Sequence, residues 1–199
     1  MPTPEDRERL YRFNRRIRET KPILTLDFQH DGEFVGGCIA GGRRYLHINA
    51  AGDVEPCVFI HYSNANVREM SLLDCLRSPI FMAYYEGQPF NDNLLRPCPM
   101  LENPECIEHM VEETGAHCTD LQATESAHDL AEKCRPAARE WAPVAERLWT
   151  DPDDPRAELR NRTCSGLADS DLERMKRQGR TMRAAFDPDR DKDSIFATK

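Results

Sequence analysis

The spacing of two cysteines around one glycine constrains this sequence more than any other feature. Cys38 is followed by 13 residues, Gly52, four further residues and Cys57. Residues 44–49 alternate polar and apolar side chains, Gly52 lies in a turn, and residues 54–60 form a second apolar run, which predicts a β-hairpin. Glycine suits the turn because it adopts positive φ without strain. The two extended arms would bring both thiols within reach of one metal centre.

A third cysteine lies in a segment that is rigid by composition. Cys98 follows after 40 intervening residues, between Pro97 and Pro99. Proline on each side restricts the backbone, and Asn103 followed by Pro104 predicts the start of a helix just downstream. The N-terminus of a helix offers free N–H groups and a positive dipole end to an anionic group. Three thiolates supplied by a hairpin and a rigid loop are typical of an iron–sulfur cluster.

Two longer runs of sequence resemble the C-terminal part of radical SAM enzymes. They are GGCIAGGRRYLHINAAGDVEPCVF (36–59) and LRPCPMLENPE (95–105). The spacing Cys-x13-Gly-x4-Cys lies within the signature of the auxiliary-cluster domains of these enzymes, the SPASM domain and the shorter twitch domain. The resemblance covers about residues 22–122. It implies one auxiliary [4Fe–4S] cluster, for electron transfer or substrate anchoring, with Cys38, Cys57 and Cys98 as its ligands.

The remaining cysteines decide between the two kinds of auxiliary domain. A full SPASM domain continues with Cys-x2-Cys-x5-Cys-x3-Cys, whereas this chain has Cys98-x7-Cys106-x11-Cys118. The resemblance therefore favours a single twitch-type cluster, whose fourth iron site is open or is filled by Cys106 or Cys118. Structural zinc is the alternative metal, because zinc also accepts thiolates and would take Cys106, His109 or His117 as its fourth ligand.

A radical SAM core needs the motif Cys-x3-Cys-x2-Cys, and the eight cysteines do not contain it. They fall at positions 38, 57, 75, 98, 106, 118, 134 and 164. We therefore expect no cleavage of S-adenosyl-L-methionine by this chain alone. Either a separate radical SAM core subunit is its partner, or the reading frame is the remnant of a split gene. Residues 3–20, a predicted helix, and residues 23–28, a predicted strand, resemble the last helix–strand unit of the missing partial barrel.

The predicted fold class is α+β, with a small β-hairpin domain that binds the cluster and helices around it. The expected parts are the remnant helix–strand unit (1–30), the iron–sulfur domain (31–122), a helical extension (123–186) and a disordered tail (187–199). Further helices are expected from Ser71 to about Gly87 with a kink at Pro79, at 104–115, at 126–149 with a kink or a break at Pro136 and Pro143, and at 171–186.

Several single residues receive structural interpretations. The helix at 3–20 is expected to bury a narrow stripe of Leu10, Phe13 and Ile17, and to leave its arginine-rich face in solvent or against a partner. His47 and His61 near the hairpin are expected to be hydrogen-bonded structural histidines rather than proton donors. Cys75 and Cys134 lie within helical segments and are expected to be buried in the core, and Cys164 is expected to be an exposed thiol.

Composition limits the other function classes. The formal charge of −8 argues against nonspecific nucleic-acid binding. No apolar run approaches the ~18 residues of a membrane span, and the charged N-terminus does not resemble a signal peptide, so we expect a cytoplasmic protein without membrane contact. The alternative function, from a different class, is a noncatalytic zinc-stabilised binding module that docks a protein partner through residues 171–186.

Overall fold

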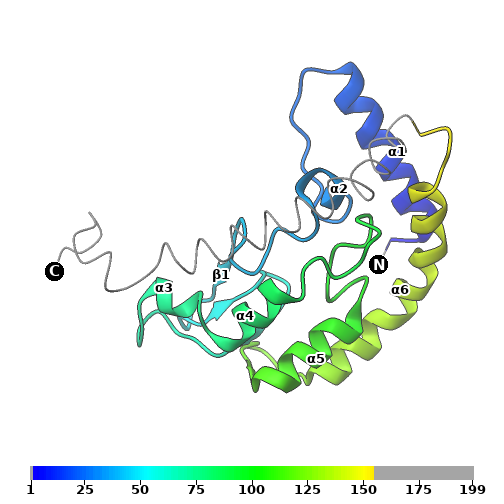
Figure 1. Ribbon diagram of the computed structural model, residues 1–199. Coiled ribbons are helices and arrows are strands. Elements are labelled where there is room, and N and C mark those ends of the chain that lie inside the picture. The colour runs from blue at the N-terminus through cyan, green and yellow to red at the C-terminus, as the bar shows by residue number, and fades with distance from the viewer. Residues whose placement is uncertain (1, 155–199) are drawn as a thin grey trace. The chain divides into compact units, whose positions relative to one another are not determined.

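The computed structural model describes residues 2–154 (Figure 1). The chain divides into two compact units, Met1–Trp149 and Thr150–Lys199. Within the second unit, residues 150–154 form a turn in which the Asp154 N–H donates to the carbonyl of Asp151 at 3.1 Å. Cys164, the expected helix at 171–186 and the expected tail at 187–199 lie outside the described residues, and the domain boundaries expected near residues 30 and 122 stay predictions.

The first unit combines helices with two small antiparallel sheets, which confirms the α+β class. One sheet pairs β1 with β2 and the other pairs β3 with β4. The helices are α1 (Pro4–Thr20), α2 (Gly32–Val35), α3 (Leu72–Cys75), α4 (Pro79–Glu86), α5 (Pro104–Thr114) and α6 (Ala127–Trp149), and the strands are β1 (His47–Ile48), β2 (Val54–Glu55), β3 (Tyr62–Ser63) and β4 (His117–Cys118).

Helix α1 begins and ends as predicted, but its buried face is a different one. The Thr3 hydroxyl accepts the Asp6 N–H at 3.2 Å, which caps the first turn. Leu10 and Phe13 are half exposed, so the expected apolar stripe is wrong. The buried residues are Arg7 and Tyr11, which pack toward α6. The partner of Arg7 is a buried carboxylate, described below, which no helical periodicity could predict.

The strand expected at residues 23–28 is absent, although the segment is extended. Its alternate residues are bound to the preceding helix and to the following turn instead of to a neighbouring strand. Arg18 Nε donates to the Thr25 hydroxyl at 2.6 Å, and Asn14 Nδ2 donates to the Asp27 carboxylate at 3.0 Å. A strand needs a ladder partner, and the described part of the chain provides none here.

The hairpin is confirmed, with shorter strands than expected. In its register His47 lies opposite Glu55 and Ile48 opposite Val54, and Gly52 has a φ of 94° in the turn. The chain leaves the ladder after Glu55, because Pro56 has no N–H to donate. It then turns back through a bridge between Cys57 and Ile60. The return strand expected over 54–60 is therefore wrong beyond Glu55.

Two further elements differ from expectation. The pairing of β3 with β4, which sets Tyr62 opposite Cys118, was not predicted, since each strand has only two residues. The helix expected from Ser71 is two separate helices, α3 and α4, and α4 begins at Pro79. Helix α6 is one helix through both of its prolines, so the break expected as one alternative at Pro136 and Pro143 does not occur. Its buried side chains keep helical spacing on each side of these prolines and pack against α5 and α1.

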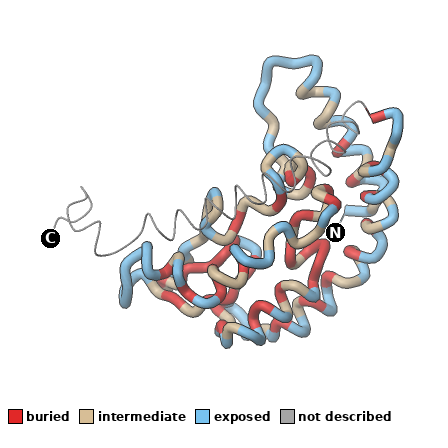
Figure 2. The backbone as a smooth tube through the Cα atoms, viewed as in Figure 1, coloured by how far each residue is buried: buried red, intermediate tan, exposed pale blue. Residues whose placement is uncertain are grey.

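The core lies at the centre of the first unit, where buried residues from the hairpin, α4 and α5 meet (Figure 2). Val54, Ile80 and Tyr84 are each fully buried there, and full burial of one such side chain contributes about 1.5–3 kcal/mol. A smaller cluster joins α1 to α6 around Trp141. Cys75 and Cys134 are buried as predicted. No helix within residues 2–154 is both long and apolar enough to cross a membrane.

Gly41 allows the loop before the hairpin to pass directly over Tyr84, and this contact generates the first prediction. Gly41 has a φ of +67°, and a Cβ added there would lie 2.2 Å from the Tyr84 ring. We expect Gly41→Ala to lower the free energy of unfolding by about 2–5 kcal/mol, from the left-handed backbone and the steric overlap together. Urea unfolding followed by circular dichroism measures it.

Gly115 provides the matched control for this substitution. It also has a positive φ, +63°, but an added Cβ meets nothing within 4 Å. Gly115→Ala should therefore cost only the backbone component, about 1–2 kcal/mol. Equal losses in the two variants would show that the contact between Gly41 and Tyr84 has no energetic role.

Candidate metal centre

Cys38 lies in a loop whose backbone is shaped by glycine. Gly37 before it and Gly41 after it have φ values of 109° and 67°, so the chain turns tightly on both sides of the thiol. Arg43 closes the loop by donating from Nη1 to the Cys38 carbonyl at 2.8 Å. The Cys38 sulfur lies 3.1 Å from the Tyr84 hydroxyl. The loop therefore holds this sulfur against α4.

Cys57 follows β2 and is buried. Its sulfur lies 2.5 Å from the hydroxyl of Tyr45, a residue on the other arm of the hairpin. Burial and the neighbouring Cys57 raise the pKa of Tyr45, so this phenol stays protonated and able to donate a hydrogen bond. The hairpin thus brings both a thiol and a donor for that thiol to one place.

Cys98 is fixed by its own backbone. Its N–H donates to Oε2 of Glu102 at 2.9 Å, and its carbonyl accepts from Asn103 Nδ2 at 3.0 Å. The Leu101 N–H donates to the Cys98 sulfur at 3.3 Å. These contacts form a tight turn that ends where α5 begins at Pro104, as the sequence predicts.

Cys38 interacts electrostatically with Cys57 and with Cys98, and all three thiols act on Tyr84. Burial raises the pKa of Cys38, and repulsion from Cys57 adds to the shift. Burial, the Glu102 carboxylate and Cys38 raise the pKa of Cys98 well above its usual range. Burial, followed by the charges of Cys38 and Cys98, likewise raises the pKa of Tyr84. The charges of all three cysteines that the sequence singles out therefore act on Tyr84, while their assignment as ligands of one centre stays a prediction.

The candidates for a fourth ligand lie on α5 and β4. Cys106 occupies the first turn of α5, where burial and Glu105 raise the pKa of its thiol. Cys118 lies in β4, and its sulfur accepts the Glu125 N–H at 3.4 Å. His109 and His117 are exposed, on α5 and β4. Within residues 2–154, no three side chains of His, Cys, Asp or Glu are grouped to hold a single metal ion.

A buried ion pair between Arg7 and Glu102 stabilises the turn at Cys98. Arg7 Nη2 lies 2.7 Å from Oε1 of Glu102, and the two side chains are 6% and 0% exposed. The same guanidinium lies 4.0 Å from the centre of the Trp141 ring. Because Glu102 also accepts the Cys98 N–H, one carboxylate connects the cysteine turn, α1 and α6.

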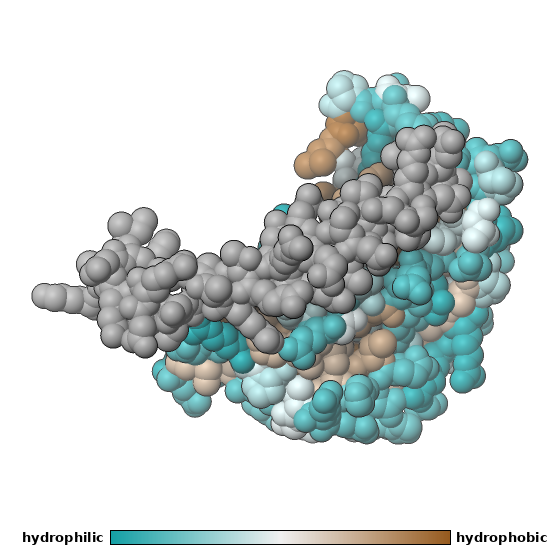
Figure 3. All heavy atoms as spheres, viewed as in Figure 1, coloured by the Kyte–Doolittle hydropathy of each residue, from teal (hydrophilic) through white to brown (hydrophobic). Residues whose placement is uncertain are grey.

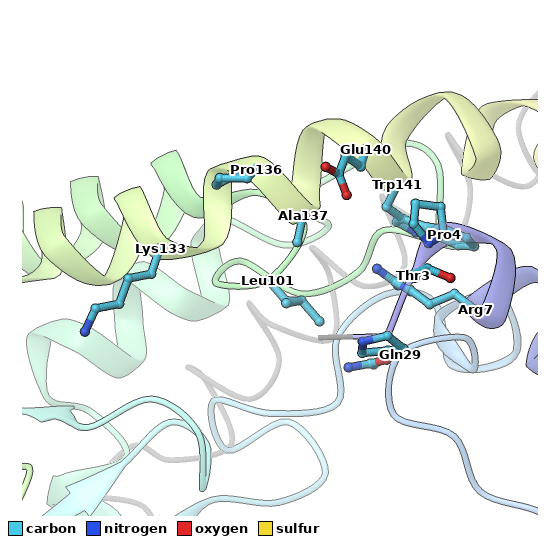
Figure 4. Close-up of a pocket in the computed structure, with 11 residues that line it drawn as sticks. Thr3, Pro4, Arg7, Gln29, Leu101, Lys133, Pro136, Ala137, Glu140 and Trp141 are labelled. Carbon is cyan, nitrogen blue, oxygen red and sulfur yellow. The ribbon is translucent and has the colours of Figure 1, made fainter.

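Sequence reasoning missed this pair, because it assigned the arginines of α1 to solvent or a partner. A usable signal was present: Arg7 and Tyr11 are four residues apart and share a helix face. A cavity of about 290 Å³ adjoins the pair, and Figure 4 shows Arg7, Leu101 and Trp141 among its lining residues.

The thiol chemistry fits a thiolate-ligated cluster. Each cysteine among the described residues is free. The sulfurs of Cys38 and Cys57 have tyrosine hydroxyls beside them, and that of Cys98 has a backbone N–H, so each has a donor that could stabilise a thiolate. Hydrogen bonds to cluster sulfurs also tune a bound iron–sulfur centre.

Comparison with known proteins identifies this part of the chain. Residues 38–107, about a third of the sequence, match the model of the SPASM family, an iron–sulfur cluster-binding domain. The match begins at Cys38, includes Cys57 and Cys98, and ends one residue after Cys106. Searches of curated proteins and of solved structures gave no match.

The ion pair generates the second prediction. Arg7→Met leaves the buried Glu102 carboxylate without its counterion, so we expect the free energy of unfolding to fall by about 3–5 kcal/mol near neutral pH. Burial already raises the pKa of Glu102 above its usual value of 4.5, although Arg7 opposes this shift. Without Arg7 the pKa should rise further, and the loss should therefore shrink as the pH falls toward 4.5. Urea unfolding at several pH values measures both effects.

Arg12→Met is the control for an exposed arginine on the same helix. Arg12 pairs with Glu8 at 2.9 Å, and its side chain is half exposed. Loss of such a surface pair costs about 0–1 kcal/mol. A loss for Arg7→Met no larger than that for Arg12→Met would contradict the role assigned to the buried pair.

Proposed function

Given an iron–sulfur cluster-binding domain at residues 38–107, we propose that Cys38, Cys57 and Cys98 hold one auxiliary [4Fe–4S] cluster of a radical SAM enzyme system. The observation that supports this proposal most directly is the position of Tyr84, whose hydroxyl lies 3.1 Å from the Cys38 sulfur and whose pKa is raised by burial and by the charges of Cys38, Cys98 and Cys57. When bound, such a cluster supplies one-electron transfer, or an iron at which a substrate is anchored.

The residues around the thiols would prepare them for ligation. Thiols must lose their protons to bind iron, and burial opposes this step at Cys38 and Cys98. Each resulting thiolate would accept a hydrogen bond already in place, from Tyr84, Tyr45 or the Leu101 N–H. The neighbouring donors thus offset part of the cost of charging buried sulfurs.

The proposed cluster is single and of the twitch type. The spacing of Cys98, Cys106 and Cys118 departs from the run of cysteines that a second cluster needs. With three protein ligands, the fourth iron site is open to a substrate or water, or takes Cys106 or Cys118.

The expected partner is a separate subunit that carries the radical SAM core and binds S-adenosyl-L-methionine in the cytoplasm. An exposed apolar strip supports a docking role: Leu24, Leu26 and Phe28 alternate along the extended segment and are 87%, 77% and 63% exposed. This segment joins α1 to α2, where Figure 3 shows a brown apolar patch. The backbones of Leu24 and Leu26 form no hydrogen bond within residues 2–154.

The strip also connects to the cysteine site. The ring of Phe28 lies 6.0 Å from the ring of Tyr45, the residue whose hydroxyl contacts the Cys57 sulfur. A partner strand paired with this segment would find both main-chain groups and apolar side chains ready to bind. It would also lie close to the proposed cluster.

Metal analysis of anaerobically purified full-length protein tests the cluster. We expect about four iron and four sulfide per chain, with a brown chromophore. Cys38→Ser, Cys57→Ser and Cys98→Ser should each lose the cluster. Cys134→Ser should keep it, because that buried thiol lies on α6.

The same experiment separates the alternatives. Stoichiometric zinc without sulfide would overturn the cluster and favour the zinc-stabilised binding module. Equal loss of iron in all four serine variants would show that the ligand assignment is wrong, since Cys134 has no place in it.

Co-expression with a neighbouring gene product that contains Cys-x3-Cys-x2-Cys tests the partner. The two chains should co-purify, and the double substitution Leu24→Asp with Leu26→Asp should abolish the complex while the iron content stays unchanged. Leu72→Asp, at another exposed leucine, is the matched control. Unchanged co-purification of the double variant, or no complex with the unmodified chain, would contradict this docking surface.

A further inference from the structure

A second group of polar side chains lies outside the cysteine site, around the carboxylate of Glu55. This carboxylate is fully buried. It contacts Nδ1 of His47 at 2.6 Å, Nδ1 of His61 at 3.3 Å, the hydroxyl of Thr119 at 2.5 Å and Nδ2 of Asn49 at 3.2 Å. An ionised carboxylate accepts about four hydrogen bonds. The four neighbours therefore satisfy it only if each of them donates.

This arrangement fixes the proton positions on the two imidazoles. When Nδ1 of a neutral histidine donates, Nε2 carries the lone pair. His47 and His61 thus each have Nε2 available as an acceptor or a metal ligand. Neither Nε2 has a hydrogen-bond partner among residues 2–154, and the two side chains are 32% and 41% exposed.

Both imidazoles line one cavity of about 430 Å³. The segment after β4 forms another part of its wall and contributes the carboxylate of Asp120. The N–H groups of Gln122 and Ala123 donate to this carboxylate at 2.8 and 3.3 Å, which lowers the pKa of Asp120 and keeps it charged. Two imidazoles and a fixed negative charge therefore line the same cavity.

We propose that His47 and His61 bind one divalent transition-metal ion, such as Zn²⁺, through their Nε2 atoms in this cavity. Imidazole suits zinc, copper and nickel. A carboxylate that accepts the other ring N–H is the usual support of a metal-ligating histidine. Glu55 supports both rings at once, and water or a small ligand completes the coordination. Nδ1 of each ring thus has the structural hydrogen-bonding role expected from the sequence, and Nε2 is the proposed metal ligand.

The hairpin explains why the site is rigid before any ion binds. His47 and Glu55 are directly paired in the β1–β2 register, and the Thr119 N–H donates to the His61 carbonyl at 2.9 Å. Backbone pairing therefore sets the positions of both imidazoles and of their shared carboxylate. The proposal does not depend on the cluster, because it uses none of the cysteines.

Calorimetric titration of full-length protein with Zn²⁺ tests the site, after anaerobic cluster loading so that the thiols are occupied. We expect a site at which His47→Ala and His61→Ala each weaken Zn²⁺ binding at least tenfold. His109→Ala, at an exposed histidine on α5, is the control and should have no effect. The triple variant of Cys38, Cys57 and Cys98 to serine should retain the site, which separates it from zinc bound by thiols.

A second measurement keeps the proposal testable if the alanine variants fail to fold. Nitrogen-15 NMR of the unsubstituted protein above pH 7 should show both imidazoles protonated at Nδ1, and added Zn²⁺ should shift both Nε2 resonances. Protonation at Nε2 in either ring, or Zn²⁺ affinity unchanged in both alanine variants, would overturn the proposal.

Discussion

The ion pair between Arg7 and Glu102 is the interaction on which the rest of the first unit depends. It places a guanidinium and a carboxylate where water is excluded, so each charge relies on the other. Glu102 shares its second oxygen with the Cys98 N–H, and Arg7 lies against Trp141. The ends of the described chain, α1 and α6, are therefore fastened to the turn that presents a cysteine. The same ion pair therefore contributes both to the stability of the fold and to the position of Cys98.

The sequence predicted much of the site because the relevant information is local. The Cys38 and Cys57 spacing around Gly52 is a property of one hairpin, and the turn at Cys98 is bounded by two prolines and a helix start. Helices α1, α5 and α6 were predictable for a similar reason. Thr3 with Pro4 and Asn103 with Pro104 mark the starts of α1 and α5, and a repeating apolar stripe marks α5 and α6. The convergence of Cys98 on the hairpin was suggested only by resemblance, because nothing local specifies a contact across 40 residues.

The errors share one physical origin, which is that long-range partners decide what a short segment becomes. Residues 23–28 have the composition of a strand, but Arg18 binds Thr25 and Asn14 binds Asp27, so the segment is held against α1 and not in a sheet. Arginine is usually exposed, yet Arg7 is buried because it pairs with Glu102, which lies far away in the sequence. The two-residue strands β3 and β4 exist because their chain segments meet.

The extended segment after α1 has a consequence for how the isolated chain behaves in solution. An edge with unpaired main-chain groups and alternating leucines is a template for pairing with another such edge. Here the polar residues Thr25 and Asp27 are bound to α1, while Leu24, Leu26 and Phe28 are exposed. Concentrated samples of the chain should therefore tend to associate through this segment. The same exposed segment would thus lower the colloidal stability of the isolated chain and provide the surface that binds a partner.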